Sequence, residues 1–343
     1  MKTTLTIDIL PQLFHFKTPA GTSRGTYTTR RSWYVRITSA DRPGREAWGE
    51  CAPLPALSLD DLPDYETTLR RVCDETARTG RLDTERWRAY PSMIFGLETA
   101  LRHRETATYR LWDTPFSRGE AGICINGLIW MGTRDEMFRQ IKMKLDAGFR
   151  CIKLKIGAID FEEEFSLLQF IRRQFPAEDV ELRVDANGAF RPGEAQEKLQ
   201  RLSELDLHSI EQPIRAGQHE EMARLAATSP LPVALDEELI ACCTRHEKIQ
   251  LLDAVHPQYI VLKPSLHGGI CGCREWIEEA QQRNIGWWIT SALESNIGLN
   301  AIAQWCATLH PVLPQGLGTG QLFTDNTAMP LEIRKDSLWY VEH

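Results

Sequence analysis

The sequence contains no long apolar run. No stretch reaches the roughly 18 to 20 apolar residues that a membrane-spanning helix requires, and the N-terminus has no basic segment followed by an apolar stretch. We therefore expect a cytoplasmic protein without membrane contact. Charge of one sign is not clustered either, because the net charge of -7 is spread along the chain without a basic block or an acidic tail. We do not expect nucleic acid as a partner.

The cysteine content argues against a disulfide framework. The chain has nine cysteines, an odd number, scattered over 343 residues, so we expect reduced thiols. Cys271 and Cys273, which follow His267, resemble a soft-metal site, but structural zinc pairs are separated by about two to four residues rather than one. We interpret this pair as small residues after a glycine-rich turn.

Composition and length are those of a folded globular protein with two domains. Hydrophobic residues make up 42% and charged residues 25% of the chain, and the length fits a β/α barrel of about 250 residues plus a smaller domain. We expect an α+β capping domain over 1–105, a barrel over 106–320, and a C-terminal segment over 321–343 that packs back on the capping domain. Thr18 to Gly25 is rich in turn formers and predicts a mobile loop that could serve as a lid.

Periodicity separates the two expected domains. In the first, strands are expected over 5–16 and 32–38 and helices over 62–79 and 92–104. From about Gly122 onward, strand-like runs alternate with helical runs such as 135–147 and 161–173. Eight strands are expected there, over 122–129, 151–156, 181–184, 209–210, 233–235, 259–262, 286–290 and 313–316. The alternation fits either an open doubly wound sheet or a closed (β/α)8 barrel.

Charged residues at the ends of these strands favour the barrel. Lys155, Asp185, Glu211, Asp236 and Lys263 follow one another at intervals of 30, 26, 25 and 27 residues. Each interval is one βα unit, so five successive strands place a charged group at the same end. In a barrel these ends converge on one mouth, where barrel enzymes hold their active sites, whereas in an open sheet they spread along a line.

The three carboxylates predict a metal site. Asp185, Glu211 and Asp236 on adjacent strands repel one another unless protons or a cation compensate their charge. Oxygen ligands suit a hard divalent cation, so we predict Mg²⁺, with Mn²⁺ as a substitute. Asn187 and Gln212 are amides that would steady the ligands or a bound water. The alternative is a lysine-carboxylate layer in which the charges satisfy one another and do no chemistry.

Lysines flank these carboxylates along the chain. Lys153 and Lys155 lie two residues apart on the second strand, so both side chains face the barrel mouth, and Lys263 on the sixth strand lies opposite in a ring of eight. A lysine buried beside a divalent cation and a second lysine has a lowered pKa and acts as a base. The arrangement predicts removal of a proton next to a carboxylate of a small-molecule substrate.

Six short motifs at and around these positions carry a family resemblance. They are Gly49-Glu-Cys-Ala-Pro-Leu-Pro55, Lys153-Leu-Lys155, Val184-Asp-Ala-Asn-Gly188, Glu211-Gln-Pro213, Leu235-Asp-Glu237 and Leu262-Lys-Pro264. Together they resemble the enolase superfamily, in its branch with Lys-x-Lys on the second strand and a lone lysine on the sixth. The resemblance covers nearly the whole chain and implies a capped barrel, Mg²⁺ and lysine base chemistry.

Further motifs narrow the resemblance within that branch. They are Ser92-Met-Ile-Phe-Gly-Leu-Glu-Thr99, Asn126-Gly-Leu-Ile-Trp130, Ser291-Ala-Leu-Glu-Ser-Asn-Ile-Gly-Leu-Asn300 and Gly316-Leu-Gly-Thr-Gly320. They look most like the o-succinylbenzoate synthase family of menaquinone biosynthesis, hydro-lyases that dehydrate 2-succinyl-6-hydroxy-2,4-cyclohexadiene-1-carboxylate to 2-succinylbenzoate. The resemblance implies that Lys155 takes the proton alpha to the ring carboxylate and returns it to the departing hydroxyl in a syn elimination. It further implies that Lys263 stabilises the enediolate, while Lys153 holds Lys155 near neutrality and meets a substrate carboxylate.

The same resemblance implies contacts to the substrate. The expected residues are Asn187, Ser291, Gly318, Gly320, Ser23 and Arg24. Ser291 follows the seventh strand, and the alternative is that it caps the next helix. Gly318 and Gly320 offer backbone amides to the succinyl carboxylate, and the alternative is a plain turn. Ser23 and Arg24 would close over the substrate, and the alternative is a solvated hairpin tip.

Other activities use related machinery. An N-acylamino acid racemase moves a proton between the same two lysine faces and remains an open alternative. A dipeptide epimerase of the superfamily carries an Asp-x-Asp pair on the eighth strand for the ammonium group of its substrate, whereas Gly316 to Gly320 contains no acid here. A muconate cycloisomerase fits the whole-chain resemblance less well. A non-catalytic barrel would be expected to lose some of the five charged strand-end residues, and all are present.

Overall fold

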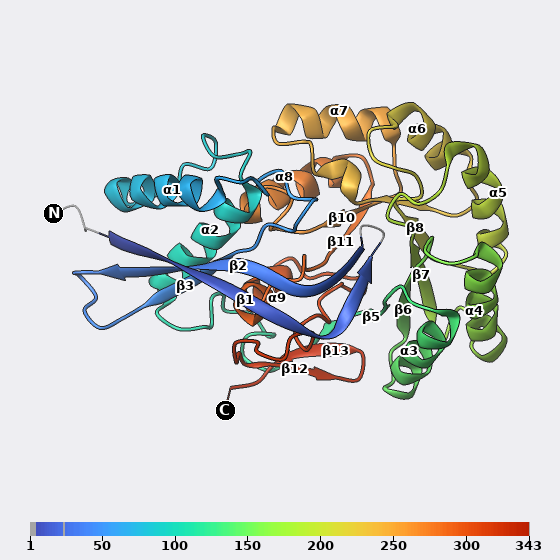
Figure 1. Ribbon diagram of the computed structural model, residues 1–343, viewed down its shortest axis with the longest axis horizontal. Helices are drawn as coiled ribbons and strands as arrows, with labels where there is room; N and C mark the ends of the chain where they lie inside the picture. The colour runs from blue at the N-terminus through green and yellow to red at the C-terminus, as the bar shows by residue number, and fades with distance from the viewer. Residues whose placement is uncertain (1–4, 23–24, 343) are drawn as a thin grey trace.

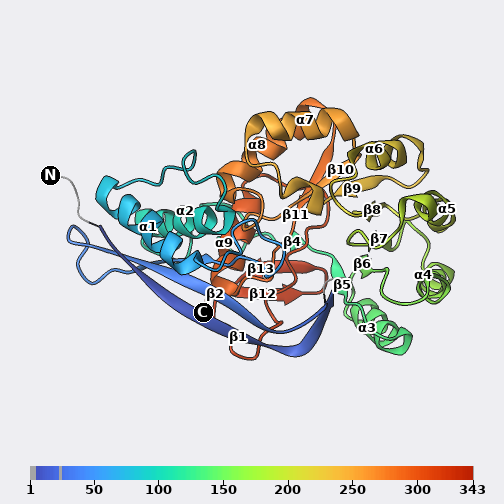
Figure 2. The same ribbon diagram turned by 45° about the horizontal axis from the view of Figure 1, so that its top comes forward.

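The computed structural model describes residues 5–22 and 25–342 and shows a capping part beside a larger α/β part (Figure 1, Figure 2). The capping part has an antiparallel sheet of β1 (Leu5–Thr22), β2 (Gly25–Ser39) and β3 (Ala47–Cys51). Its helices are α1 (Tyr65–Thr79) and α2 (Pro91–Thr106). Both helices bury apolar side chains against the sheet, among them Leu69 and Leu97, which pack in one cluster with Val35.

The β1–β2 hairpin extends further than the sequence predicts. Most of the segment 18–25, expected as a mobile loop, belongs to the two strands instead. The pairs at the hairpin end are Ala20 with Tyr27, Gly21 with Thr26 and Thr22 with Gly25. The register shifts between His15 and Ala20, so the turn-forming residues there accommodate an irregularity within the strand rather than a loop. Ser23 and Arg24 lie outside the described residues.

The α/β part contains a curled parallel sheet of seven strands in the order β11-β10-β9-β8-β7-β6-β5. The strands are β5 (Gly127–Ile129), β6 (Cys151–Lys155), β7 (Glu181–Asp185), β8 (Ser209–Glu211), β9 (Val233–Leu235), β10 (Tyr259–Leu262) and β11 (Gly286–Ile289). Because the order follows the chain, each crossover adds one strand beside the last. All seven begin and end within a few residues of the predicted strands, although the first predicted strand is divided into β4 (Ile123–Cys124) and β5.

Helices cover the outer face of this sheet (Figure 2). They are α3 (Arg134–Asp146), α4 (Phe161–Gln174), α5 (Pro192–Ser203), α6 (His219–Thr228), α7 (Arg245–Val255), α8 (Gly269–Gln282) and α9 (Asn296–Ala307), with a short 3-10 helix η1 (Glu237–Leu239) after β9. Thr133 and Thr244 begin α3 and α7 with capping boxes. Across residues 5–22 and 25–342, no helix combines the length and the apolar character needed to cross a membrane.

The eighth predicted strand, residues 313–316, is not a regular strand. It makes two isolated parallel bridges, from Gln315 to Ile125 and from Gly316 to Thr290. Ile125 precedes β5 and Thr290 follows β11, so this short segment lies between the two edges of the curled sheet. Pro314 lies within the segment and cannot donate a backbone hydrogen bond, and only the next two residues, Gln315 and Gly316, form bridges.

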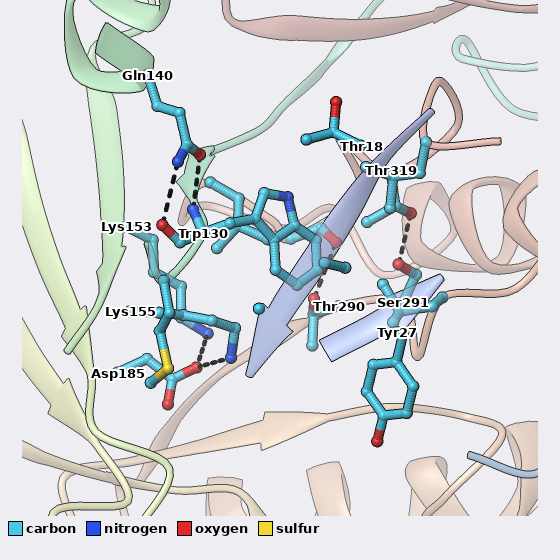
Figure 3. A pocket seen from close by; sticks show the side chains of 18 of the residues that line it. Thr18, Tyr27, Trp130, Gln140, Lys153, Lys155, Asp185, Thr290, Ser291 and Thr319 are labelled. Carbon is cyan, nitrogen blue, oxygen red and sulfur yellow. Dashed lines mark hydrogen bonds and ion pairs between the residues drawn. The ribbon is translucent and has the colours of Figure 1, made fainter. Parts of the chain in front are cut away.

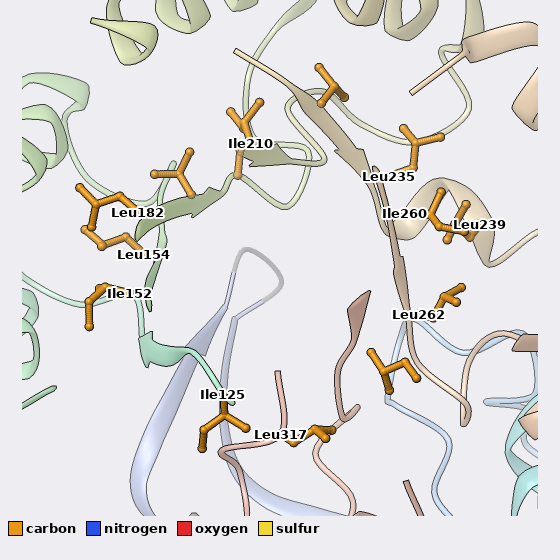
Figure 4. Close-up of a cluster of buried hydrophobic side chains, with 14 of the residues drawn as sticks. Ile125, Ile152, Leu154, Leu182, Ile210, Leu235, Leu239, Ile260, Leu262 and Leu317 are labelled. Carbon is orange, nitrogen blue, oxygen red and sulfur yellow. The ribbon is translucent and has the colours of Figure 1, made fainter. Parts of the chain in front are cut away.

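Alternation along β6 separates the apolar core from the cavity side of the sheet. Ile152 and Leu154 are fully buried in the layer between strands and helices, which Figure 4 shows together with aliphatic residues of the neighbouring strands. Lys153 and Lys155 occupy the alternate positions and therefore point to the opposite face, inside the curl. The core fixes the register of β6 and thereby the place of both lysines.

The C-terminal segment contacts both parts of the molecule. At its start, the Lys17 N–H donates to the Leu322 carbonyl (2.8 Å) and the Thr324 N–H donates to the His15 carbonyl (2.9 Å) on β1. Further along, β12 (Leu331–Arg334) and β13 (Ser337–Tyr340) form a small antiparallel sheet with β4. The segment 321–343, predicted to pack on the capping domain, thus contacts β1 with its first residues and the α/β part with its last strands.

Arg30 of β2 joins the two parts through main-chain carbonyls. Its guanidinium is fully buried and donates to the carbonyls of Ala52 and Pro53 in the capping part and of Ala292 and Leu293 after β11. The planar donor fork of arginine suits several carbonyls at once. The loop after β11, which borders the cavity, is therefore tied to the capping sheet.

Two carboxylates of the capping part bind the starts of helices in the α/β part. Glu50 of β3 accepts hydrogen bonds from the Ser295 N–H (2.9 Å) and the Gly298 N–H (3.0 Å) at α9. Glu98 of α2 accepts from the N–H groups of Ile270 (2.6 Å) and Cys271 (3.0 Å) at α8. Helix starts carry unpaired N–H groups and partial positive charge, so a carboxylate is a favourable partner for them.

Candidate active site

A cavity of about 830 Å³ lies where the carboxyl ends of the parallel strands face the β1–β2 hairpin (Figure 3). The strands contribute Lys153, Lys155 and Asp185 to its lining, Lys263 follows the end of β10, and the hairpin contributes Tyr27. Barrel enzymes hold their active sites at this end of the sheet, and the volume suits a small organic acid.

Lys153 bridges two of the predicted metal ligands. Its Nζ lies 2.9 Å from Oδ2 of Asp185 and 2.6 Å from Oε2 of Glu211. The two carboxylate residues are each 1% exposed. Parallel pairing of β7 with β8 places Asp185 beside Glu211, as the spacing in the sequence predicts. The ammonium group therefore serves as a shared counter-charge for two neighbouring acids.

Lys155 begins a short chain of polar contacts at the cavity surface. Its Nζ donates to Oδ2 of Asp185 (3.0 Å) and to Oδ1 of Asn187 (2.7 Å). Asn187 in turn donates from Nδ2 to Oε1 of Glu237 (3.0 Å). Asn187 has φ of 44°, a left-handed conformation that asparagine tolerates better than most residues. Its side chain thereby orients the ammonium group of Lys155.

Lys263 approaches from the other side of the curled sheet. It follows β10, four strand positions from β6. Its Nζ donates to Oδ2 of Asp236, a buried carboxylate that follows β9. The backbone N–H of Lys263 donates to Nδ1 of His267 (2.9 Å) within the turn that leads to α8. The structure thus brings all six predicted catalytic and metal-binding residues to one end of the sheet.

The charges in this cluster shift one another's pKa values in opposite directions. Burial and the neighbouring charge of Asp185 raise the pKa of Glu211 well above its usual range. Burial also acts on Asp185, but Lys153 and Lys155 outweigh it and lower the pKa of that carboxyl. Burial disfavours the charged form of Lys153 and Lys263, yet the adjacent carboxylates prevail and raise the pKa of both. The sequence predicts lowered lysine pKa values beside a cation, whereas the protein groups alone keep these two lysines protonated.

Lysine ammonium groups lie against carboxylate oxygens that a metal ion would need as ligands. Among residues 5–22 and 25–342, no three His, Cys, Asp or Glu side chains are arranged as a ready metal-binding group. However, Oε1 of Glu211 and Oδ1 of Asp236 are buried and accept no hydrogen bond from the described residues. Such acceptors are costly unless a donor or a cation satisfies them, and an all-oxygen set suits Mg²⁺. Asp185, Glu211 and Asp236 therefore fit a hard divalent cation.

Three of the predicted substrate contacts line the cavity, namely Asn187, Ser291 and Gly318. The Ser291 hydroxyl lies 2.6 Å from Oγ1 of Thr319, another lining residue (Figure 3). Ser291 does not cap the next helix. Ser295 does, because its Oγ accepts from the Ile297 N–H at the start of α9. The helix-cap alternative for Ser291 is therefore wrong.

The other predicted contacts fall elsewhere. Gly320 is not part of the cavity lining. Its carbonyl accepts a hydrogen bond from Nδ2 of Asn326 (3.0 Å), and a Cβ at this position would lie 2.9 Å from Oδ1 of Asn296. A side chain at this position would press against the Asn296 amide of α9. Ser23 and Arg24 lie outside the described residues.

Sequence reasoning missed the apolar and aromatic part of the lining. It includes Tyr27, Leu54, Leu57, Trp130 and Leu322. Trp130 directly follows the first strand of the sheet, a strand-end position like those of the charged residues. An aromatic residue at a strand end fits a core equally well, so the pattern does not reveal it.

Comparison with known proteins identifies the family. Residues 136–338 match the family described as Enolase C-terminal domain-like, and residues 14–104 match the family described as MenC, N-terminal domain. An o-succinylbenzoate synthase of Desulfotalea psychrophila is 45% identical, over 93% of this chain and 94% of that protein. The chain belongs to the o-succinylbenzoate synthase family of the enolase superfamily.

Solved structures agree with membership in the o-succinylbenzoate synthase family. The crystal structure of MenC from Desulfotalea psychrophila has a TM-score of 0.83 at 40% identity and covers 98% of this chain and 99% of its own. The L-Ala-D/L-Glu epimerase from Bacillus subtilis has a TM-score of 0.84 at 20% identity, with 99% of this chain and 96% of its own covered. At that identity the epimerase shows only that the fold is shared. The resemblance inferred from the motifs is thus confirmed at the level of the family.

Proposed function

We propose that this chain is an o-succinylbenzoate synthase that dehydrates 2-succinyl-6-hydroxy-2,4-cyclohexadiene-1-carboxylate to 2-succinylbenzoate in menaquinone biosynthesis. The similarity to a relative of that name over 93% of the chain carries the proposal. The cavity supports it, because lysines from β6 and from the end of β10 line the same space. Two lysine amines on either side of a bound substrate carboxylate suit the removal of a proton from the carbon next to that carboxylate.

Asp185, Glu211 and Asp236 would hold Mg²⁺, which when bound supplies positive charge to the substrate carboxylate as negative charge develops there. The fit rests on buried oxygen atoms that lack a donor. A cation among these acids would also compensate the charge that raises the pKa of Lys153 and Lys263. The lysine network would then be easier to deprotonate.

The proton steps fall to Lys155 and its neighbours. The neutral amine of Lys155 accepts the proton from the ring carbon alpha to the carboxylate, and the electron pair of that C–H bond enters the enediolate. The same ammonium then donates its proton to the hydroxyl. The enediolate electrons form the new ring double bond as the C–O bond breaks and water leaves. Lys263 stays charged on the other side and offsets the enediolate. Asn187 holds Lys155 in place, and Lys153 meets a substrate carboxylate.

The proposal includes the completed fold. The bridges of Gln315 to Ile125 and of Gly316 to Thr290 support a closed (β/α)8-type barrel with this segment at the eighth position. We assign the capping domain to 1–105, the barrel to 106–320 and the C-terminal segment to 321–343. All nine cysteines are free, which supports a reducing, cytoplasmic setting.

The decisive experiment offers two substrates to the purified chain with Mg²⁺. We expect rapid loss of the diene absorbance of the cyclohexadiene substrate, with 2-succinylbenzoate as the product. In a parallel reaction, N-succinylamino acids are tested for racemisation by chiral chromatography. The second candidate is an N-acylamino acid racemase, favoured by lysines on two strands that could serve both faces of one carbon. Racemisation without dehydration would replace the first proposal by the second.

A further inference from the structure

Trp130 is an aromatic residue at the end of β5 that lines the cavity. Ile129 pairs with Leu154 in the parallel ladder, so Trp130 and Lys155 are the next residues along their strands. Both side chains belong to the cavity lining, and Figure 3 shows the indole extending from the strand end into the cavity. Trp130 therefore lies level with the proposed base.

Gln140 of α3 fixes the backbone of Trp130. Its Oε1 accepts from the Trp130 N–H (2.8 Å), and its Nε2 donates to the Trp130 carbonyl (3.2 Å) (Figure 3). Trp130 lies one residue beyond the last ladder pair of β5, so the glutamine amide supplies hydrogen bonds that the sheet does not. Both main-chain polar groups of Trp130 are held by a single side chain on a helix.

The indole itself packs against apolar side chains of the capping part. Trp130 is half-buried against a cluster that includes Ala20 of β1, Leu54 of the capping part and Leu293 after β11. Hydrogen bonds thus hold its backbone and packing holds part of its ring. The rest of the ring forms a fixed, flat wall of the cavity.

We propose that Trp130, positioned by Gln140, is a specificity-determining residue that selects a six-membered ring carboxylate over an open-chain acylamino acid. A ring that becomes planar on dehydration can lie against the indole in an offset or edge arrangement. A branched acylamino acid side chain needs the volume that the indole fills. The inference rests on the proposed function, because it names the feature of the substrate that this site selects.

The test compares Trp130→Leu and Trp130→Phe with the wild type in the full-length chain with Mg²⁺. Two quantities are measured: kcat/KM for dehydration of the cyclohexadiene substrate, and the competitive inhibition constant of N-succinyl-L-leucine in the same assay. In Trp130→Leu we expect kcat/KM to fall about 10-fold, mainly through KM, because the aromatic contact is lost. The inhibitor should bind Trp130→Leu at least as tightly as it binds the wild type. The kcat/KM of Trp130→Phe should lie between those of the wild type and Trp130→Leu.

Gln140→Leu tests the positioning role, because it removes both hydrogen bonds while the indole stays in the chain. Selection for the ring is the product of kcat/KM for the diene and the inhibition constant of N-succinyl-L-leucine, each relative to wild type. We expect Gln140→Leu to lower this product by about 3-fold. Lys142→Ala, an exposed residue of α3 outside the cavity lining, is the matched control and should leave both quantities unchanged. A general loss of folded protein lowers the apparent kcat, and with it kcat/KM, but leaves KM and the inhibition constant unchanged, so kcat and KM are determined separately.

Two results overturn the inference. If the wild type dehydrates the diene but selection in Trp130→Leu and Trp130→Phe stays within about twofold of wild type, Trp130 does not determine specificity. If the wild type does not dehydrate the diene at all, the proposed function fails and this inference fails with it. An unchanged Gln140→Leu alongside altered Trp130 variants would overturn the positioning role alone.

Discussion

At the residue scale, every lysine of the buried cluster has an acidic partner. Three lysines face three carboxylates, and each lysine has at least one carboxylate oxygen within 3.0 Å. An unpaired buried charge costs several kcal/mol, whereas a paired one is tolerated. Because of this pairing, removal of any one lysine takes a positive charge away from at least one buried acid.

We predict that Lys155→Ala and Lys263→Ala each lower kcat for dehydration by about 10³-fold or more, since each removes a group that acts on the reacting carbon. The rate is followed by diene absorbance, and circular dichroism checks that the fold remains. Lys142→Ala serves as a surface control. Full activity in either active-site variant would refute the assigned roles.

The sequence predicts the charged part of the site but not its apolar walls. A lysine or an acid within or directly after an apolar strand conflicts with burial, so Lys155 and Asp185 stand out without a structure. Trp130 does not conflict with burial and gives no such signal. Gly320 shows the converse, because a glycine that packs closely against Asn296 looks the same in sequence as one that binds a ligand.

At the element scale, carboxylates of the capping part cap two helices of the α/β part. Glu50 is fully buried and accepts three hydrogen bonds at the start of α9, two from N–H groups and one from the Ser295 hydroxyl (2.6 Å). Charge-assisted bonds of this kind are stronger than neutral ones. The link between the two parts therefore depends on named side chains as well as on apolar area.

Replacing Glu50 by alanine should lower the free energy of unfolding by about 3 kcal/mol, because buried donors of α9 lose a charged acceptor. Urea unfolding followed by circular dichroism measures the change. Glu46→Ala is the matched control on the same part of the chain, since its carboxylate is an exposed partner of Arg36. A surface pair of that kind contributes about 1 kcal/mol or less. Equal effects of the two substitutions would contradict the capping role.

Glu98 gives a pH dependence with a defined sign. Burial raises the pKa of its carboxyl to about 7 and outweighs the hydrogen bonds from Ile270 and Cys271. Because the folded-state pKa is raised, the contribution of the protonated group to stability is full below the unfolded value near 4.5 and is lost as the pH rises through about 7. The wild type should therefore lose about 3 kcal/mol relative to Glu98→Gln between pH 4.5 and pH 8. Urea unfolding of both proteins across this range tests it, and a constant difference would contradict the raised pKa.

Strands that lie between two clear helical patterns were predictable, and irregular elements were not. Strands such as β9 and β10 match their predicted bounds, because an apolar run between two helical patterns has few other interpretations. The turn-forming residues over 18–22 mislead because they belong to a strand that pairs with β2. The segment 313–316 contains Pro314, which cannot donate a ladder hydrogen bond, and only its two bridges mark its place.

At the scale of the whole molecule, metal binding should couple to stability. A cation that binds Asp185, Glu211 and Asp236 in the folded state but not in the unfolded state stabilises the fold. At a free cation concentration of 100 times the Kd, the free energy of unfolding rises by about 2.7 kcal/mol. We expect Mg²⁺ to raise the Tm of the wild type and to leave that of Glu211→Gln nearly unchanged. Dehydration should stop after chelation and return with Mg²⁺. Undiminished turnover in protein shown to be metal-free would refute the metal site.

The contact between Glu50 and α9 also limits how this enzyme can be recombined with its relatives. A Cβ at Gly298 would lie 2.7 Å from Cβ of Glu294 in the same part and 2.9 Å from Oε2 of Glu50 across the junction. A chimera that joins a foreign capping domain to this barrel must therefore bring a carboxylate to the same point, and a foreign barrel must offer a glycine. Domain exchange in this family therefore requires a matched pair at the positions of Glu50 and Gly298, in addition to complementary surfaces on the capping domain and the barrel.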